Sequence, residues 1–338
     1  MAANFTGKGH TVVVVDSGAG TYYHESNVIY DHDFADGDDD GRDPRIFSHG
    51  AQVADVVTDT AVDAQIIHLK VFEDFASGGK LADVEAALQW VIANANAYDV
   101  AAVNLSIGYG DVNQPTQTQL SDELSAIKVA GIVTVVSSGN DGRENTADGI
   151  NVLAANDDVI AVGALDRAET ARAAWSQHGD LLGVYAPGED VMVDMPWFYS
   201  GERAVSNTSF AAPKVAGAVA IVQEAAISEY GQALSPSQFE YLLSVSAHDA
   251  VEGAPVVDID AMVASLQDGY AFIVRLRRPA GRAPIGRAGR RSPHRRGRWP
   301  DRKRRWRDSP RRFAASGARR PANPWPHRDG RNQPCPSR

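Results

Sequence analysis

Short apolar runs alternate with longer amphipathic stretches along residues 1–268. The apolar runs are rich in β-branched residues and predict buried strands at 11–15, 65–71, 100–106, 132–137 and 159–163. The longer stretches predict helices at 81–97, 118–130, 210–228 and 235–246. Alternating strands and helices predict an α/β fold. We expect a three-layer sandwich with a mostly parallel central sheet that helices cover on both faces.

The apolar run at 11–15 ends at an acidic residue, Asp16, and Ser17 and Gly18 follow it. Asp16 is therefore expected at the carboxyl edge of the sheet, where the ligand sites of open parallel sheets collect. Taken alone, a strand-end aspartate is more often a turn or capping residue, and that interpretation stays open at this point.

A histidine, His49, precedes the apolar stretch 51–57, which predicts a buried helix after Gly50. The scaffold would hold a side chain there in one place, as a general base requires. A capping or core histidine is the alternative, and for a single histidine it is the commoner case.

Two hydroxyl residues, Thr208 and Ser209, stand before the nearly all-apolar helix predicted at 210–228. The positive end of a helix dipole favours the negative charge that develops when a serine nucleophile transfers an acyl group. Either hydroxyl can instead cap the helix. Pro213 is expected in the first helical turn, where its missing N–H costs nothing.

Small residues end the run at 132–137, and Asn140 follows them. The side-chain amide of Asn140 can donate a hydrogen bond to a developing oxyanion. The segment Asn140-Asp141-Gly142 is also a good turn sequence, and this is the structural alternative.

Together, these four segments resemble the signature blocks of the subtilisin-like serine proteases, the subtilases. Asp16, His49, Asn140 and Ser209 occur in the family's order, separated by 33, 91 and 69 residues. The resemblance extends over residues 7–265. It implies a subtilisin-like fold and a serine endopeptidase that works through an acyl-enzyme intermediate. By the same resemblance, Asp16, His49 and Ser209 form the catalytic triad, and Asn140 donates in the oxyanion hole.

The resemblance also implies two segments that bind an extended peptide substrate. They are Ser106, Ile107 and Gly108, in an edge strand that would pair with the peptide backbone, and Ser137, Ser138 and Gly139, which would wall the first specificity pocket. Because these walls are small and apolar, we expect the pocket to accept large apolar side chains.

Five positions depart from the family's pattern. In the histidine block, Ala51, Gln52 and Asp55 stand where threonine, histidine and glycine are usual, and Phe210 stands where methionine usually follows the nucleophile. Asn207 replaces a glycine before Ser209, at a position where a positive φ is expected. Asparagine tolerates positive φ better than most residues. None of these changes removes a group of the triad.

The formal net charge of −10 is the sum of an acidic segment and a basic segment. Up to residue 270 the chain has 11 basic and 40 acidic residues, and beyond it 22 basic and 3 acidic ones. We expect a catalytic domain at 1–268 and a disordered Arg/Pro-rich tail at 269–338. With GC-rich codons, a shift of one nucleotide can turn 291–297 into a sequence like the calcium-binding repeats of repeats-in-toxin exoproteins. We therefore favour a frameshift origin for the tail.

An acidic loop places Asp36, Asp38 and Asp40 at alternate positions before Gly41, as the first half of a calcium loop does. Phe47 occupies the position of the expected distal glutamate. A solvated acidic loop is therefore favoured over a calcium site. The chemistry requires no cofactor, and calcium at this loop would be structural.

The sequence also limits the binding partners and the cellular location that we expect. The N-terminus shows no signal peptide, the run at 12–15 is too short for a transmembrane segment, and Cys335 is the single cysteine. We expect a protein or peptide substrate, no specific nucleic-acid partner, and a monomer. Secretion without an N-terminal signal peptide, through a C-terminal export signal in an intact relative, is favoured over a cytoplasmic location.

Two alternatives to an endopeptidase stay open. The same triad can transfer the acyl group to an amine instead of water, which would make the chain a peptide ligase or cyclase. A non-catalytic product could instead bind nucleic acid or membrane through its basic tail.

Overall fold

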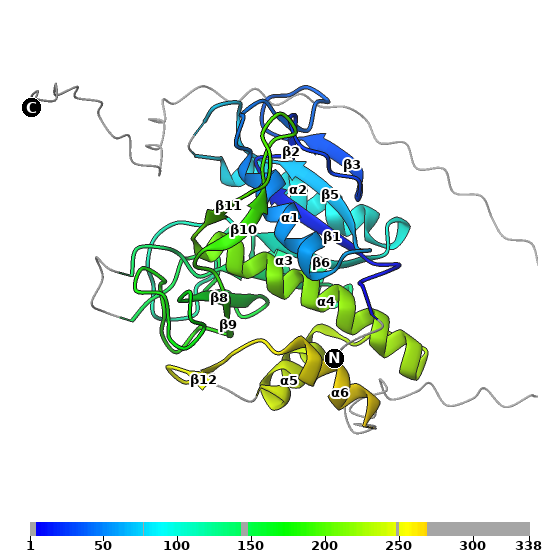
Figure 1. Cartoon of the computed structure of the whole chain (residues 1–338), viewed down its shortest axis with the longest axis vertical. Helices are drawn as coiled ribbons and strands as arrows, with labels where there is room; N and C mark the ends of the chain where they lie inside the picture. The colour runs from blue at the N-terminus through cyan, green and yellow to red at the C-terminus, as the bar shows by residue number, and fades with distance from the viewer. Residues whose placement is uncertain (1–4, 77, 143–147, 248–249, 269–338) are drawn as a thin grey trace, which may run out of the picture. The chain divides into compact units, whose positions relative to one another are not determined.

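The structure is a computed structural model that describes residues 5–76, 78–142, 148–247 and 250–268 (Figure 1). The predicted tail at 269–338 lies outside the described residues.

A seven-stranded parallel sheet forms the centre of the fold, in the order β3-β5-β1-β6-β7-β8-β9. Its strands are β1 (Thr11–Asp16), β3 (Val28–Asp33), β5 (Gln65–Lys70), β6 (Val100–Leu105), β7 (Val133–Ser137), β8 (Ile160–Leu165) and β9 (Val184–Pro187). The five strands that the sequence predicts are all present. The two outermost strands, β3 and β9, were not predicted.

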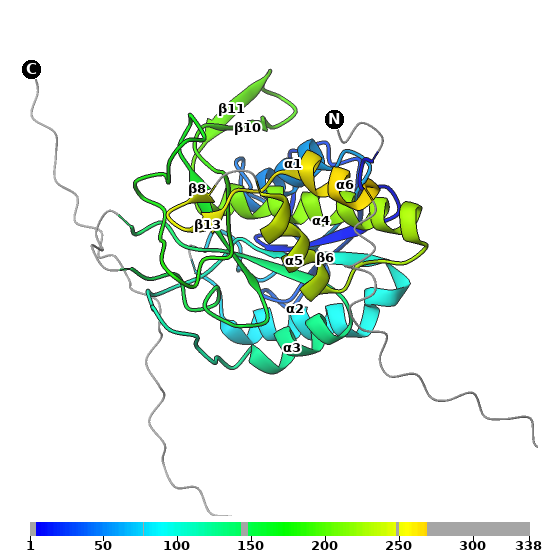
Figure 2. The same cartoon turned by 90° about the horizontal axis from the view of Figure 1, so that it is seen from below.

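Helices cover both faces of this sheet, which confirms the predicted three-layer sandwich (Figure 2). One face carries α1 (His49–Thr60), α4 (Thr208–Tyr230), α5 (Pro236–Ser246) and α6 (Ile259–Gln267), and the other carries α2 (Leu81–Asn94) and α3 (Ser121–Val129). Along β1, Val12 and Val14 pack on the α4 side, and Val13 and Val15 pack on the α2 side. This alternation explains why central strands read as unbroken apolar runs.

Short elements complete the fold. They are β2 (Ala19–Gly20) paired with β4 (Arg42–Asp43), the hairpin of β10 (Val191–Asp194) and β11 (Glu202–Val205), β12 (Ala250–Val251) paired with β13 (Ala254–Pro255), and the 3₁₀ turn Ala95–Ala97.

Helix α4 runs through the core, and two expectations about its start are wrong. Asn207 precedes the helix with φ −174°, an extended conformation that any residue adopts, so no positive φ is needed there. Pro213 lies in the second turn rather than the first, because the helix already begins at Thr208. In the described part of the chain, α4 alone is long and apolar enough to span a membrane. However, 83% of its apolar window is buried, as in the core helix of a globular fold.

Candidate active site

The structure brings Asp16 and His49 into direct contact at the carboxyl edge of the sheet. Asp16 is the last residue of β1, and His49 is the first residue of α1, whose start the Ser48 hydroxyl caps by accepting the Ala51 N–H. The distance between Asp16 Oδ1 and His49 Nδ1 is 2.7 Å. Because Asp16 belongs to a strand and His49 to a helix, the fold itself fixes the relative position of the two side chains.

The environment of this pair suits a base that a buried carboxylate holds in place. The Asp16 side chain is 1% exposed and that of His49 is 35% exposed. Asp16 Oδ1 also accepts the backbone N–H of Ser17 at 2.7 Å. Burial lowers the pKa of His49, but the charge of Asp16 and the hydrogen bond to it outweigh burial and raise that pKa above its ordinary value. With Nδ1 donating to Asp16, Nε2 is left as the proton acceptor.

Ser209 lies beside this pair in the first turn of α4. It is 7% exposed, and its Oγ donates to the backbone oxygen of Ser106 at 3.2 Å. The next residue, Phe210, packs its ring against the His49 ring with 5.5 Å between centroids. In the described part of the structure, no hydrogen bond joins Ser209 to His49. Hydrogen bonds between a nucleophile and its base are often loose without substrate, so this geometry is compatible with catalysis.

Asn140 lies next to the start of α4, where Thr208 orients its side chain. Asn140 Oδ1 accepts both the N–H of Thr208 at 2.8 Å and its hydroxyl at 2.9 Å. Among the described residues, Asn140 Nδ2 has no hydrogen-bond acceptor and can donate. In the described part of the chain, the Ser209 N–H has no protein acceptor either. Two free donors beside a nucleophile can stabilise an oxyanion. Sequence reasoning treated Thr208 only as a cap and missed this orienting role.

The first predicted substrate segment lies just beyond β6. The edge strand was expected at 103–108, but β6 ends at Leu105 and pairs with β1 and β7, so residues 103–105 belong to a central strand and not to an edge. Ser106, Ile107 and Gly108 follow its last residue, and the described structure assigns no strand pairing to them. Within 103–108, the backbone without a strand partner in the described structure is therefore that of 106–108.

The second predicted segment, Ser137 to Gly139, packs tightly against Gln177, which sequence reasoning missed. Ser137 and Ser138 are buried, and the Ser138 hydroxyl donates to the Gln177 backbone oxygen at 2.9 Å. Gly139 has φ +110°, and a Cβ there would lie 1.7 Å from Gln177 Oε1. Only glycine fits this turn. Gly139 is the one residue of the three with appreciable exposure.

The acidic loop does not bring its three aspartates together. Asp36 forms an ion pair with Lys70, a residue of β5. Asp38 and Asp40 instead accept backbone N–H groups two residues further along the chain, at 3.0 Å and 3.2 Å. The described residues contain no group of three or more acidic, His or Cys side chains placed to hold a metal ion. Calcium at this loop stays a prediction.

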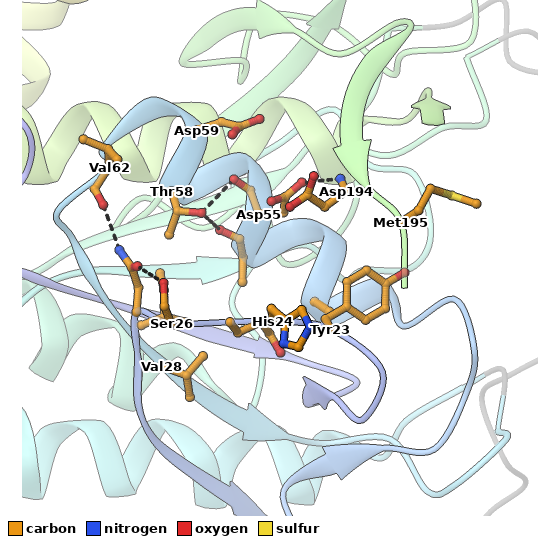
Figure 3. Close-up of a pocket in the computed structure, with 15 residues that line it drawn as sticks. Tyr23, His24, Ser26, Val28, Asp55, Thr58, Asp59, Val62, Asp194 and Met195 are labelled. Atoms are coloured by element: carbon orange, nitrogen blue, oxygen red, sulfur yellow. Dashed lines mark hydrogen bonds between the residues drawn. The ribbon is translucent and has the colours of Figure 1, made fainter. Parts of the chain in front are cut away.

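A separate pocket of about 290 Å³ opens beside α1, and Asp55 lines it (Figure 3). None of Asp16, His49 and Ser209 belongs to its lining. Burial raises the pKa of Asp55, the N–H of Asp194 lowers it, and neighbouring carboxylates raise it further, to about 7. The family departure at this position thus places a carboxyl group with a raised pKa in a pocket beside α1.

The structure is a three-layer α/β sandwich that gathers Asp16, His49 and Ser209 at one edge of its parallel sheet, an arrangement typical of hydrolytic enzymes. A family model for the subtilase family of peptidases matches residues 7–265. The chain belongs to this family, and it spans less than half the length of some of the curated proteases that it matches.

Known relatives and solved structures agree with this assignment. Subtilisin DY of Bacillus licheniformis is 30% identical over 256 residues, which cover 73% of this chain and 86% of that protein. Alkaline serine exoprotease A of Vibrio alginolyticus is 30% identical over 252 residues, which cover 72% of this chain but only 42% of that protein. A cold-adapted subtilisin-like serine proteinase has a matching fold, with a TM-score of 0.58, 24% identity, and coverage of 75% of this chain and 86% of that one.

Proposed function

We propose that the chain is a serine endopeptidase whose triad is Asp16, His49 and Ser209. The observation that carries this proposal is the 2.7 Å contact between the buried Asp16 carboxylate and His49, next to the Ser209 turn. An aspartate in that place holds the imidazole in the tautomer that can accept a proton at Nε2.

The proposed reaction begins when Ser209 Oγ leaves the Ser106 backbone oxygen and attacks a peptide carbonyl carbon. His49 Nε2 takes the hydroxyl proton, and the negative oxygen accepts hydrogen bonds from Asn140 Nδ2 and the Ser209 N–H. The carbon–nitrogen bond then breaks as His49 returns the proton to the leaving amine. Water, activated by the same imidazole, hydrolyses the acyl-serine ester and releases the acid.

Substrate contacts and cellular context belong to the same proposal. The free backbone of 106–108 would pair with an extended peptide on the acyl side, and Gly139 would form part of the pocket for its side chain.

We also propose an extracellular place of action. Fractionation of a producing culture tests it, because activity confined to the cytoplasm would contradict it. The monomeric state stays a prediction that size-exclusion chromatography tests.

Labelling with a fluorophosphonate tests the triad directly. The reagent is expected to add to Ser209 alone, which peptide mass mapping locates. Ser209→Ala is expected to lose labelling and about 10⁶-fold in turnover, the magnitude found for subtilisin. Labelling of another serine, or an active alanine variant, would contradict the assignment. Product masses with a peptide and an added amine distinguish hydrolysis from ligation.

A further inference from the structure

Strand β6 breaks its apolar pattern at one buried position, Asn104. Alternation along the strand puts Asn104 on the same face as Ala102, which belongs to the core on the α4 side. Asn104 is fully buried, and its Nδ2 donates to Ser106 Oγ at 2.9 Å. Asn104 Oδ1 has no partner in the described structure. A buried amide with an unsatisfied oxygen is costly, so this position indicates a role beyond packing.

Pro213 leaves one carbonyl group of α4 without its usual helical partner. In a regular helix the N–H of residue 213 would donate to the Ser209 carbonyl, but proline has no N–H. The Ser106 hydroxyl takes that place and donates to the Ser209 backbone oxygen at 2.8 Å. In return, Ser209 Oγ donates to the Ser106 backbone oxygen at 3.2 Å. Ser106 therefore holds both the backbone and the side chain of Ser209.

Asn104 controls the direction in which the Ser106 hydroxyl points. A serine hydroxyl has one proton and can give it to one acceptor at a time. Because Asn104 Nδ2 donates to Ser106 Oγ, the hydroxyl proton is left for the Ser209 backbone oxygen. An acceptor in place of the amide nitrogen would draw this proton away and leave the Ser209 carbonyl unpaired.

We propose that Asn104 is a positioning residue for the nucleophile, acting through the Ser106 hydroxyl on the first turn of α4. This role rests on the proposed function, because it requires Ser209 to be the nucleophile. The bonds fix the backbone from which Ser209 Oγ must reach His49 Nε2 and the peptide carbonyl. Small displacements of a nucleophile reduce turnover more than they reduce substrate binding.

Asn104→Leu, which keeps the size of the side chain and removes its donor, tests the proposal. With an amide substrate, kcat is expected to fall roughly 10- to 100-fold while KM stays within about twofold. Asn104→Asp turns the donor into an acceptor, and an equal or larger fall is expected. Thr134→Val is the matched control. Thr134 is buried on the adjacent strand β7, and its hydroxyl has no partner in the described structure. Its kcat is expected to be unchanged.

A double-mutant cycle separates positioning from general packing. In a Ser106→Ala background, Asn104→Leu is expected to cause no further loss of kcat, because its route to Ser209 is gone. Thermal unfolding is measured for each variant, and Asn104→Ala replaces Asn104→Leu in the cycle if the latter does not fold. An unchanged kcat, a change in KM alone, or an equal loss in both backgrounds would overturn the role of Asn104.

The outcome for the wild-type enzyme distinguishes this proposal from the one on which it rests. A wild-type protein that neither cleaves peptides nor reacts with a fluorophosphonate overturns both. An active wild type with fully active Asn104 variants overturns only the positioning role.

Discussion

Two pairs of an aspartate with a basic side chain lie side by side at the carboxyl edge of the sheet, and they differ in their surroundings. Asp16 ends β1 and binds His49, whereas Asp33 ends β3 and binds Lys70. Lys70 is the sheet neighbour of both aspartates, because it is in register with Asp16 on one side and with Asp33 on the other. In both pairs, a strand-end aspartate binds a basic side chain, and both pairs lie next to Lys70 in the sheet.

The two pairs differ in the solvent exposure of the basic side chain and in the number of carboxylates that it binds. The His49 side chain is 35% exposed, and Asp16 is its only ion-pair partner among the described residues. The Lys70 side chain is 3% exposed and also binds Asp36 and Asp74. Burial lowers the pKa of Lys70, but hydrogen bonds to three carboxylates outweigh burial and raise that pKa. An open pair with one carboxylate can exchange protons near neutral pH, whereas an enclosed pair with three is a fixed structural charge.

The largest expected effect comes from breaking the open pair. Asp16→Asn keeps the shape of the side chain but no longer selects the correct imidazole tautomer, so turnover is expected to fall about 10⁴-fold. Peptide cleavage rates measure this loss, and thermal unfolding checks that the variant is folded. A variant with near wild-type turnover would show that Asp16 is not the orienting acid.

Breaking the enclosed pair is expected to affect stability instead. Lys70→Met leaves the buried Asp33 carboxylate without its cation and is expected to destabilise the fold by about 3–5 kcal/mol. Urea unfolding measures this difference. Lys80→Met is the control, because Lys80 pairs with Glu73 at an exposed site and should change nothing measurable. Equal unfolding midpoints for wild type and Lys70→Met would contradict the structural role.

The pH dependence sharpens the contrast. Because Asp16 raises the pKa of His49, kcat/KM is expected to fall as pH drops through a midpoint above the ordinary histidine value of about 6.5. Asp16→Asn should lower that midpoint. The same raised pKa means that the pair stabilises the fold fully below the ordinary value, and that this stabilisation is lost as pH rises through the raised value. A pH–rate profile with no group titrating in this range would contradict the role of His49.

The smallest expected effect concerns a carboxyl group that has no cation partner. Asp55 has no ion pair among the described residues, and its pKa is about 7. A pKa raised on folding means that its stabilising contribution is present below the unfolded value and lost as pH rises toward 7. Asp55→Asn should therefore raise the melting temperature at pH 8 but leave it unchanged at pH 4. Equal shifts at both pH values would contradict this explanation.

The central part of the fold was predictable because its strands are buried on both faces. Unbroken apolar runs predicted the five inner strands, and the apolar stretch after Ser209 predicted α4. The edge strand β3 escaped prediction because most of its residues keep contact with solvent and its composition is mixed. The hairpin of β10 and β11 escaped as well, since it packs only one face against the protein.

The candidate site was predictable only in part. The chain order of Asp16, His49 and Ser209 was enough to propose them as a triad, and the structure places Asp16 against His49 with Ser209 beside them. Thr208 and Gln177 were missed because their roles depend on contacts with residues far away in the chain. The role proposed for Asn104 combines a contact two residues away with one that spans 103 residues.

The sequence by itself determined the class of fold, the candidate reactive groups and the strong acidity of the domain, because burial patterns and residue chemistry are local properties. Only the tertiary structure decided that a second strand-end aspartate, Asp33, pairs with Lys70. It also decided that the Ser106 hydroxyl donates to the Ser209 carbonyl, which has no helical partner because Pro213 lacks an N–H. Those outcomes depend on register and helix placement, which arise when segments far apart in the chain pack against one sheet.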